Sequence, residues 1–372
     1  MLEGLVVYDF TRALSGPWCT RMLADLGATV VKFEPPGGDP IRRAAVRYAD
    51  GTSSFFNHLS AGKRSVEADL ADTRVQEQIL ETITGVDVVV ENFKPGTMAR
   101  FGLSYSTLSE RDPRLVMCSI SGFGQEGPDA RVAAYATAGE AAGGIAWLQR
   151  DEHGVPRFSA TVSVDIGSGS YALSGILAAL LQRERSGTGC HVDVSMLESA
   201  LTFHGRVPHQ IGAGLKQEEL VLGDRDGVLL AHVAHRYFVL SFVNDDAWQR
   251  VAAVLARPDV AHDAAFATRQ ARTEHWHEIT QFVQQWADRC TDAEQAVASL
   301  REGGLAAEVV RDVNGALAHP QLEYRQFLQR VGSHHDLTTS LPFRFSSNPV
   351  IPGAPPAALD EYGPEWRTSA PR

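Results

Sequence analysis

The chain has 372 residues, 44% of them apolar and 21% charged, so it is long enough for two domains and too apolar to be a disordered protein. Its 34 Lys and Arg stand against 45 Asp and Glu, and the net charge of −11 argues against a nucleic-acid coat or a basic membrane-surface protein. This charge does not exclude a small anionic ligand, which a few backbone N–H groups can hold.

The cysteines are widely spaced, at Cys19, Cys118, Cys190 and Cys290. They form no CxxC pair, so the sequence predicts neither a metal site nor a redox dithiol. Sparse cysteines are typical of a reducing compartment. The first residues do not resemble a signal peptide, and the longest apolar runs fall short of the roughly 20 residues that a membrane span needs. We therefore expect a cytoplasmic protein that binds neither nucleic acid nor a membrane.

Short apolar runs alternate with longer amphipathic ones in the N-terminal part of the chain. The runs expected to form strands cover residues 5–10, 28–33, 86–90, 115–120 and 191–194. The runs with apolar residues three and four apart, expected to form helices, cover residues 18–26, 74–83 and 166–185. Strands that alternate with helices predict βαβ units around a mostly parallel sheet, and therefore the α/β class.

The pattern of apolar and charged residues changes after about residue 210. A turn cluster, GDRDG, runs from Gly223 to Gly227, and an alternating segment and charged helical segments follow it. We expect a large domain over residues 1–211, a smaller α+β domain over 212–303, and a C-terminal segment over 304–372. The tail from His335 is Pro-rich and irregular, but its many aromatic and branched residues predict that it packs back on the large domain.

A turn with the sequence TRALSGP follows the first predicted strand at residues 11–17. Pro17 is typical of a helix start, and such a turn leaves free N–H groups at the edge where α/β sheets bind ligands. No GxGxxG motif follows this strand, and no GxxxxGK[ST] motif occurs anywhere in the sequence. On its own, the segment favours a plain turn between a strand and a helix.

A second segment, ENFKPGTMARFG at residues 91–102, follows the third predicted strand in the same way. Asn92 can donate and accept hydrogen bonds, Phe93 offers a face to an aromatic ring, and Arg100 can reach a phosphate. The alternative is a loop with a solvated arginine.

Six blocks, taken in order and spacing, resemble the family III CoA-transferases, or CaiB/BaiF family. This family also holds formyl-CoA:oxalate transferase, carnitine CoA-transferase and the α-methylacyl-CoA racemases. The blocks are DFTRALSGP, LGATVVKFEPPGGDPIR, GKRSVEADL, VVENFKPGTMARFGL, SGFGQEGP and VDIGSGSYALSGILAALLQRERSGTGCHVDVSMLESAL. A weaker match continues through residues 303–322.

The resemblance implies a large Rossmann-like domain, a small domain, and two chains threaded through each other as an interlocked homodimer. It places coenzyme A between the two domains and near both subunits, with an acyl-CoA and a carboxylic acid as substrates and no metal or redox cofactor. The α/β pattern of residues 1–211, the different pattern of residues 212–303 and the expected packing of the tail on the large domain are compatible with this architecture.

The resemblance places the catalytic nucleophile at Asp165, in the loop just before the long predicted helix. Val164 and Ile166 flank it, so the carboxylate can be desolvated, as a nucleophile must be. A Gly/Ser-rich turn follows, whose N–H groups can hold a carboxylate or an oxyanion. The residues alone favour an N-cap aspartate, and the resemblance shifts the interpretation to catalysis.

In the transferase mechanism that the resemblance implies, CoA passes through an aspartyl–acyl anhydride and an aspartyl-CoA thioester. The racemase relatives pair the aspartate with a histidine, whose position holds Tyr135 here, followed by Ala136. Tyrosine is a weak base near neutral pH, which favours the transferase over the racemase alternative. Glu140 either positions substrate or caps a helix. A third hypothesis is a CoA-binding member of the family without catalytic activity.

The resemblance also implies a set of CoA contacts, the first three through the backbone: Ala13, Leu14, Ser15, Asn92, Phe93 and Arg100. Several positions depart from the family pattern, because Leu14 replaces a glutamine, Pro35 an arginine and Ala71 a lysine. These departures, together with the missing glycine-rich loop of formyl-CoA transferase, mean that oxalate and formate are not expected substrates, and Leu14 indicates a less polar acyl pocket. The family's glycine-rich closing loop is missing unless the turn from Gly223 to Gly227 replaces it.

Overall fold

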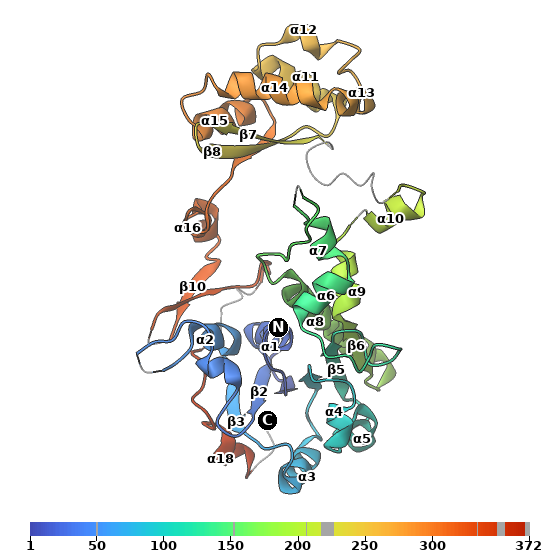
Figure 1. Ribbon diagram of the computed structural model, residues 1–372. Helices are drawn as coiled ribbons and strands as arrows, with labels where there is room; N and C mark the ends of the chain where they lie inside the picture. Colours follow the sequence, from blue (N-terminus) through green and yellow to red (C-terminus); the bar gives the residue numbers. More distant parts are fainter. Residues whose placement is uncertain are drawn as a thin grey trace. The chain divides into compact units, whose positions relative to one another are not determined.

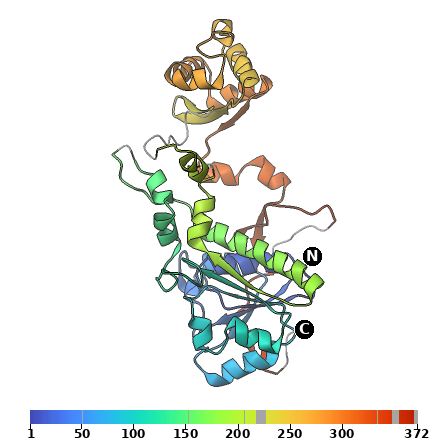
Figure 2. The same cartoon turned by 90° about the vertical axis from the view of Figure 1, so that its right-hand side faces the viewer.

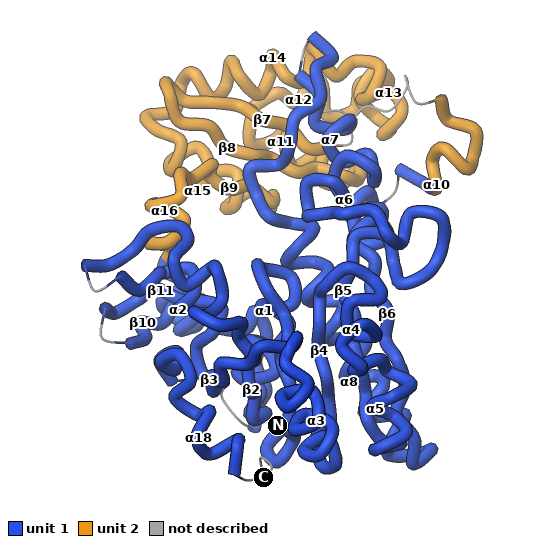
Figure 3. The backbone as a smooth tube through the Cα atoms, turned by 60° about the horizontal axis from the view of Figure 1, so that its bottom comes forward, with its two compact units in different colours: residues 1–208, 320–372 blue, residues 209–319 orange. Residues whose placement is uncertain are grey.

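The structure (Figure 1) is a computed structural model that describes residues 1–49, 51–151, 153–205, 207–216, 227–332, 334–347 and 354–368. Two units can be separated: unit 1 comprises Met1–Pro208 and Pro320–Arg372, and unit 2 comprises His209–His319 (Figure 3). The predicted GDRDG turn lies outside the described residues, apart from Gly227.

A six-stranded sheet forms the centre of unit 1, and every neighbouring pair of strands in it is parallel. Its order is β3 (Arg64–Glu67), β2 (Thr29–Glu34), β1 (Val6–Asp9), β4 (Val88–Glu91), β5 (Val116–Ser121) and β6 (His191–Ser195). This order is that of a Rossmann sheet, so the predicted α/β class with a parallel sheet is confirmed. Only β3 was not predicted, because RSVE is short and has charged residues at both ends.

The central strands are buried on both faces, which is why they appear as almost continuous apolar runs. On one face, Val7, Val88 and Val116 pack against α1 (Ser15–Asp25) and α8 (Ser163–Ser186), and α8 runs along the sheet (Figure 2). The opposite face carries a second core, formed by Tyr8, Val31, Val89 and Met117 with α3 (Thr73–Thr82), α5 (Tyr105–Arg111) and α18 (Gly363–Trp366).

The other elements of unit 1 are short. They are η1 (Pro40–Arg43), α2 (Ser54–Ser60), α4 (Thr97–Arg100), α6 (Ala136–Ala142), α7 (Ile145–Leu148), α9 (Met196–Thr202) and α17 (Pro320–Tyr324). Helix α10 (Val207–Gly212) spans the boundary between the units.

The C-terminal segment returns to unit 1 at Pro320 and is partly regular, because β10 (Leu328–Val331) and β11 (Asp336–Thr339) form an antiparallel hairpin. The Asp336 carboxylate accepts a hydrogen bond from the Asn57 amide at 2.6 Å. Trp366 is fully buried, and its Nε1 donates to the Tyr8 hydroxyl at 3.1 Å. The tail therefore contributes to both the polar and the apolar interior of unit 1.

Unit 2 is built on a three-stranded antiparallel sheet of β7 (Val228–Val233), β8 (Arg236–Ser241) and β9 (Ala306–Val309). Its helices are α11 (Asp245–Val254), α12 (Pro258–Ala261), α13 (Arg269–Glu274), α14 (Trp276–Ala287), α15 (Ala293–Glu302) and α16 (Val313–Leu317). Phe238, Trp248 and Val283 lie in its single core. The unit extends past residue 303 because β9 pairs with β8.

Helix α8 differs from the expectation for apolar runs. It has 24 residues and is long and apolar enough to cross a membrane by length and composition, whereas the sequence analysis expected only shorter runs. In the structure, 44% of its apolar stretch is buried, and Ala172, Leu173 and Ile176 lie in the core between α8 and the sheet. Its apolar character therefore serves packing in unit 1.

A buried ion pair fixes the turn that follows β1. Asp9 is fully buried, and its carboxylate lies 3.0 Å from Lys63 Nζ and accepts hydrogen bonds from the Thr11 N–H at 2.9 Å and the Thr20 hydroxyl at 2.7 Å. Lys63 Nζ also donates to the Pro17 carbonyl at 2.9 Å. The pair thus holds both the beginning of the turn and the first turn of α1.

A second lysine completes this polar interior. Lys32 Nζ donates to the Thr11 carbonyl at 2.7 Å and lies 2.9 Å from the Asp39 carboxylate. Burial opposes ionisation of Asp9, but the charges of Lys63 and Lys32 outweigh it and hold the pKa of Asp9 below its usual range. Burial lowers the pKa of Lys63 to about 8, although the Asp9 charge opposes this shift.

Replacement of Lys63 by Met is expected to lower the free energy of unfolding by about 3–5 kcal/mol, because it leaves the Asp9 carboxylate buried without its partner. Urea unfolding followed by circular dichroism measures the loss. The matched control is Arg114→Met, since Arg114 and Glu184 form an ion pair at 2.9 Å with side chains 49% and 65% exposed. Its loss is expected to stay below about 1 kcal/mol. Equal losses of unfolding free energy in the two variants would contradict a stabilising role for the buried pair of Asp9 and Lys63.

Candidate functional site

The two predicted ligand-binding turns meet at the point where the strand order reverses. Strands β1 and β4 are neighbours, and the turns at residues 11–17 and 92–96 leave their carboxyl ends. In a doubly wound sheet this switch point is where ligands bind. The Arg12 N–H donates to Asn92 Oδ1 at 2.8 Å, and Asn92 Nδ2 donates to the Arg12 carbonyl at 2.8 Å. The asparagine side chain thereby joins the two turns.

A cavity of about 240 Å³ opens at this switch point. Six segments line it, and their residues are Arg12, Ala13, Ser15, Asn92, Phe93, Lys94, Pro95, Ile120, Ser121, Gly122, Val132, Ala133, Ala134, Tyr135, Asp165 and Met196. Of the residues predicted from the sequence, the cavity brings together Ala13, Ser15, Asn92, Phe93, Tyr135 and Asp165.

Three predicted residues lie outside the cavity lining. The Leu14 side chain packs beside Ile41 and Phe56, so it does not make the cavity less polar. Arg100 is exposed on α4, with its guanidinium 5.3 Å from the centre of the Phe101 ring. Glu140 is only 3% exposed on α6, and its carboxylate accepts a hydrogen bond from the Ser159 N–H at 3.1 Å.

Asp165 belongs to the first turn of α8, which begins at Ser163. The expectation of a loop aspartate is therefore wrong, and so is the N-cap alternative, because the N-cap position is Val162. The Val164 side chain is fully buried, and its packing explains why the helix starts earlier than the sequence pattern indicates.

Close contact between α8 and α1 brings Asp165 to the turn after β1. A Cβ atom at Gly169 would lie 2.4 Å from the Ser15 carbonyl oxygen and 3.0 Å from the Trp18 ring, so only glycine fits there. The Ser15 N–H forms a backbone hydrogen bond to the Asp165 carboxylate. An aspartate two residues into α8 is thus held against the N-terminus of α1.

The environment of Asp165 makes its carboxylate more basic. Burial raises the pKa of Asp165 to about 6, the Ser15 hydrogen bond opposes this shift, and the negative charge of Glu140 adds to it. A desolvated carboxylate with a pKa below neutral is ionised at pH 7 and still poorly solvated. This is the state that a carboxylate nucleophile requires.

Several residues of the cavity are not among those predicted from the sequence. Ser121 and Gly122 lie in the SGFGQEGP block that carries the family resemblance, and a Cβ at Gly122 would lie 2.2 Å from Ala134 Cβ. This glycine was the available signal for close contact between two segments. Met196, Lys94 and the Arg12 side chain have no local signal in the sequence.

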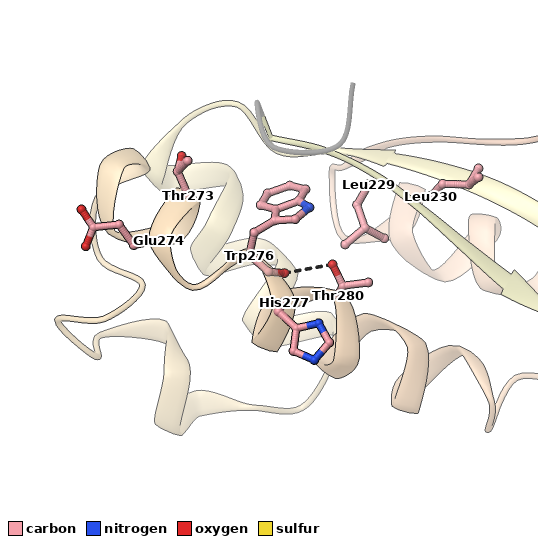
Figure 4. Close-up of a pocket in the computed structure, with 7 residues that line it drawn as sticks. All are labelled: Leu229, Leu230, Thr273, Glu274, Trp276, His277 and Thr280. Carbon is pink, nitrogen blue, oxygen red and sulfur yellow. Dashed lines mark hydrogen bonds between the residues drawn. The ribbon is translucent and has the colours of Figure 1, made fainter. Parts of the chain in front are cut away.

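Unit 2 has a pocket of its own, of about 370 Å³, shown in Figure 4. Its lining consists of Leu229, Leu230, Thr273, Glu274, Trp276, His277 and Thr280. The Thr280 hydroxyl donates to the Trp276 carbonyl at 2.9 Å, so this polar group is already paired. None of the predicted site residues lies in this pocket. Within the described ranges, no cluster of three His, Cys, Asp or Glu side chains suits a metal ion.

The model of CoA-transferase family III matches residues 2–361. The chain belongs to this family. Among its relatives, the succinyl-CoA–D-citramalate CoA-transferase of Chloroflexus aurantiacus is 33% identical, over 98% of this chain and 90% of that protein. The succinate–glutarate CoA-transferase of Agrobacterium fabrum is 31% identical, over 87% of this chain and 83% of that protein.

Solved structures show the same similarity. A CaiB/BaiF family protein from Brucella suis has a TM-score of 0.85 and 28% identity, and the match covers 99% of this chain and 98% of that one. A hypothetical protein from Mycobacterium tuberculosis has a TM-score of 0.87 and 28% identity over 98% of both chains. The predicted family is thus confirmed. The protein is an enzyme that transfers CoA from an acyl-CoA to a carboxylic acid, as expected for the transferase rather than the alternatives.

The Asp165 carboxyl is expected to lose its charge at acidic pH with a midpoint near 6, and kcat/KM for the donor should follow this midpoint wherever transfer needs the carboxylate. Glu140→Gln removes a negative charge that raises the pKa of Asp165, so the midpoint should move to lower pH. Initial rates between pH 4.5 and 8 measure this shift. Glu198→Gln, an exposed residue of α9, is the control and should leave the midpoint in place. An unmoved midpoint in Glu140→Gln would show that the charge of Glu140 does not act on Asp165.

Proposed function

We propose that Asp165 is the nucleophile of the transfer and carries CoA as a thioester. One observation supports this most directly. Of the described residues that line the cavity at the switch point, Asp165 alone is acidic, and burial raises its pKa to about 6. The Ser15 N–H hydrogen bond orients the carboxylate, and the N-terminus of α1 favours negative charge at this place.

In the first half of the reaction, one Asp165 oxygen attacks the thioester carbonyl of the donor. The carbon–sulfur bond breaks, CoA leaves as a thiolate, and an anhydride joins the donor acyl group to Asp165. The thiolate then attacks the Asp165 carbonyl, and the anhydride carbon–oxygen bond breaks. The donor acid leaves as a carboxylate, and CoA remains on Asp165 as a thioester.

The second half repeats these steps with the acceptor. Its carboxylate attacks the aspartyl thioester and expels the CoA thiolate, which forms an anhydride between the acceptor and Asp165. The thiolate then attacks the acceptor carbonyl, so the new acyl-CoA leaves and the Asp165 carboxylate returns. Both halves need stabilisation of a tetrahedral oxyanion, for which N–H groups at the start of α1 are the nearest candidates.

The same cavity supports the proposed CoA contacts. Ala13, Ser15, Asn92 and Phe93 line it, so the pantetheine arm can reach Asp165 along these two turns. In this proposal Leu14 contributes its backbone, Arg100 contacts CoA outside the cavity, and Tyr135 and Glu140 position the acid. Relatives named for succinyl-CoA make this thioester the first donor to test.

We also propose that the protein is a cytoplasmic, interlocked homodimer with a large domain, a returning C-terminal segment, and a small domain that extends past residue 303 to include β9. Apolar side chains on the outer face of α8 support a partner there, because Tyr171, Leu177 and Leu181 are 43%, 36% and 58% exposed. Leu201 and Phe203 are also exposed at the end of α9. A second copy that covers α8 would remove this apolar surface from water.

Incubation with succinyl-CoA, without acceptor and followed by hydroxylamine, is expected to convert Asp165 into a hydroxamate. Peptide mass spectrometry locates the modification. Asp165→Asn should abolish both the adduct and transfer, with kcat lower by roughly 10³-fold or more. Asp193→Asn, in an exposed residue of β6, is the control and should keep the adduct at Asp165. An adduct on another residue would exclude Asp165 as the carrier.

Stability provides a second readout for Asp165→Asn. The folded pKa of about 6 lies above the ordinary value of 3.8, so ionisation of Asp165 costs folding free energy as pH rises through this range. The variant should therefore be more stable than the wild type by about 1–3 kcal/mol at pH 8, and this advantage should vanish near pH 4. An equally large advantage at both values would contradict a raised pKa in the folded state.

Light scattering is expected to give twice the mass of one chain at micromolar concentration. Because interlocked chains separate only when they unfold, dissociation and loss of circular dichroism should coincide in urea. Leu181→Glu places a charge on the exposed face of α8 and should reduce the dimer yield, whereas Glu184→Gln on the same helix should not. A dimer that dissociates before it unfolds would contradict the interlocked arrangement.

A further inference from the structure

Arg12 is a cation of the cavity to which the described residues offer no carboxylate partner. Arg12 lines the same cavity as Asp165, and its guanidinium carbon lies 5.2 Å from the centre of the Phe93 ring. Within the described part of the chain, no Asp or Glu forms an ion pair with Arg12. Its backbone is fixed by the two hydrogen bonds to Asn92. The residue is therefore anchored at its base and leaves its charged end available.

The position of the guanidinium over Phe93 limits its motion and covers one of its faces. The N–H groups of a guanidinium lie in its plane, and they match two carboxylate oxygens in a fork that lysine cannot reproduce. A stacked arginine therefore needs less ordering when a carboxylate binds to it. The Arg12 guanidinium over Phe93 is therefore suited to bind a planar anion that enters the cavity beside this ring.

The negative charges of Asp165 and Glu140 oppose the binding of an acceptor acid, so a cation is needed to offset them. An acceptor acid must bring its reacting carboxylate toward Asp165, whose surroundings include the negative charge of Glu140. Arg12 and Lys94 are the cations among the cavity residues. A carboxylate that reacts at Asp165 cannot also occupy the Arg12 fork, so the fork is free for a second one on the same acid.

We propose that Arg12 binds the second, non-reacting carboxylate of a dicarboxylic acid and thereby makes the enzyme prefer dicarboxylic over monocarboxylic acceptors. This inference rests on the proposed transfer through Asp165, which places the reacting carboxylate in this cavity. A phosphate of CoA has the same anionic chemistry and is the alternative source of the ligand. The two possible ligands predict different effects of Arg12. Only if Arg12 binds a second carboxylate does it influence which acceptor acid the enzyme prefers.

A competition experiment separates these sources. Glutarate and pentanoate are mixed at equal concentration with one fixed acyl-CoA donor, and mass spectrometry measures the ratio of glutaryl-CoA to pentanoyl-CoA. This ratio depends only on the acceptor half of the reaction. The wild type should favour glutarate, and Arg12→Gln should lower the ratio by roughly 10- to 100-fold, as expected for lost hydrogen bonds to a charged group.

The matched control is Arg150→Gln. Its guanidinium lies 5.1 Å from the centre of the Trp147 ring, so it has the same stacking, but it does not line the cavity. The ratio should stay within about twofold of the wild type, because surface substitutions have small effects. The fold of Arg12→Gln is checked by its circular dichroism and by hydroxylamine trapping at Asp165.

Three results would overturn the assignment. An unchanged ratio with a raised KM for the donor would assign Arg12 to a CoA phosphate. An unchanged ratio with an unchanged KM would leave Arg12 without a ligand. A wild type with no preference for glutarate would show that no second carboxylate is recognised. Failure of the transfer mechanism itself is distinguishable, because the wild type would then form no adduct at Asp165 in the absence of an acceptor.

Discussion

The buried pair between Asp9 and Lys63 is the interaction on which the geometry of the site depends. Removing two charges from water is costly, and this cost is offset only if each remaining polar atom has a partner. The Asp9 carboxylate and the Lys63 ammonium meet this condition with Thr11 in the turn and with Pro17 and Thr20 in α1. These hydrogen bonds hold the turn after β1 in place, although the turn itself has no regular secondary structure.

The position of Asp165 follows from this rigidity. Helix α8 approaches α1 closely at Gly169, where a Cβ atom would lie 2.4 Å from the Ser15 carbonyl oxygen, and this contact brings the first turn of α8 next to the start of α1. The Ser15 N–H then faces the Asp165 carboxylate, while burial and the charge of Glu140 raise its pKa to about 6. Two opposing effects thus act on one group. One hydrogen bond keeps the carboxylate oriented, and the surroundings keep it poorly solvated and reactive.

The sequence was sufficient for features that follow from burial and not for those that follow from tertiary contact. Strands β1, β4 and β5 were predicted because burial on both faces produces apolar runs, whereas β3 has Arg64 and Glu67 at its ends. The residues around Asp165 favoured a helix cap, and only the family resemblance pointed to catalysis. The start of α8 was missed because it depends on the burial of Val164. Which side chains share a cavity depends on the sheet order, and no local pattern shows that Leu14 lies outside it while Arg12 lines it.

Net charge and local charge lead to different expectations for this protein. With 34 basic against 45 acidic residues, the chain as a whole repels anions. At physiological ionic strength, however, exposed charges are screened beyond about 8 Å, so an acid inside the cavity is affected mainly by the groups that line it. Among the described residues that line it, the charged ones are Arg12, Lys94 and Asp165, and the negative charge of Glu140 acts on Asp165 from outside the lining. An acidic protein can therefore bind an anionic substrate, provided that a few cations lie in the cavity and are not neutralised by neighbouring carboxylates.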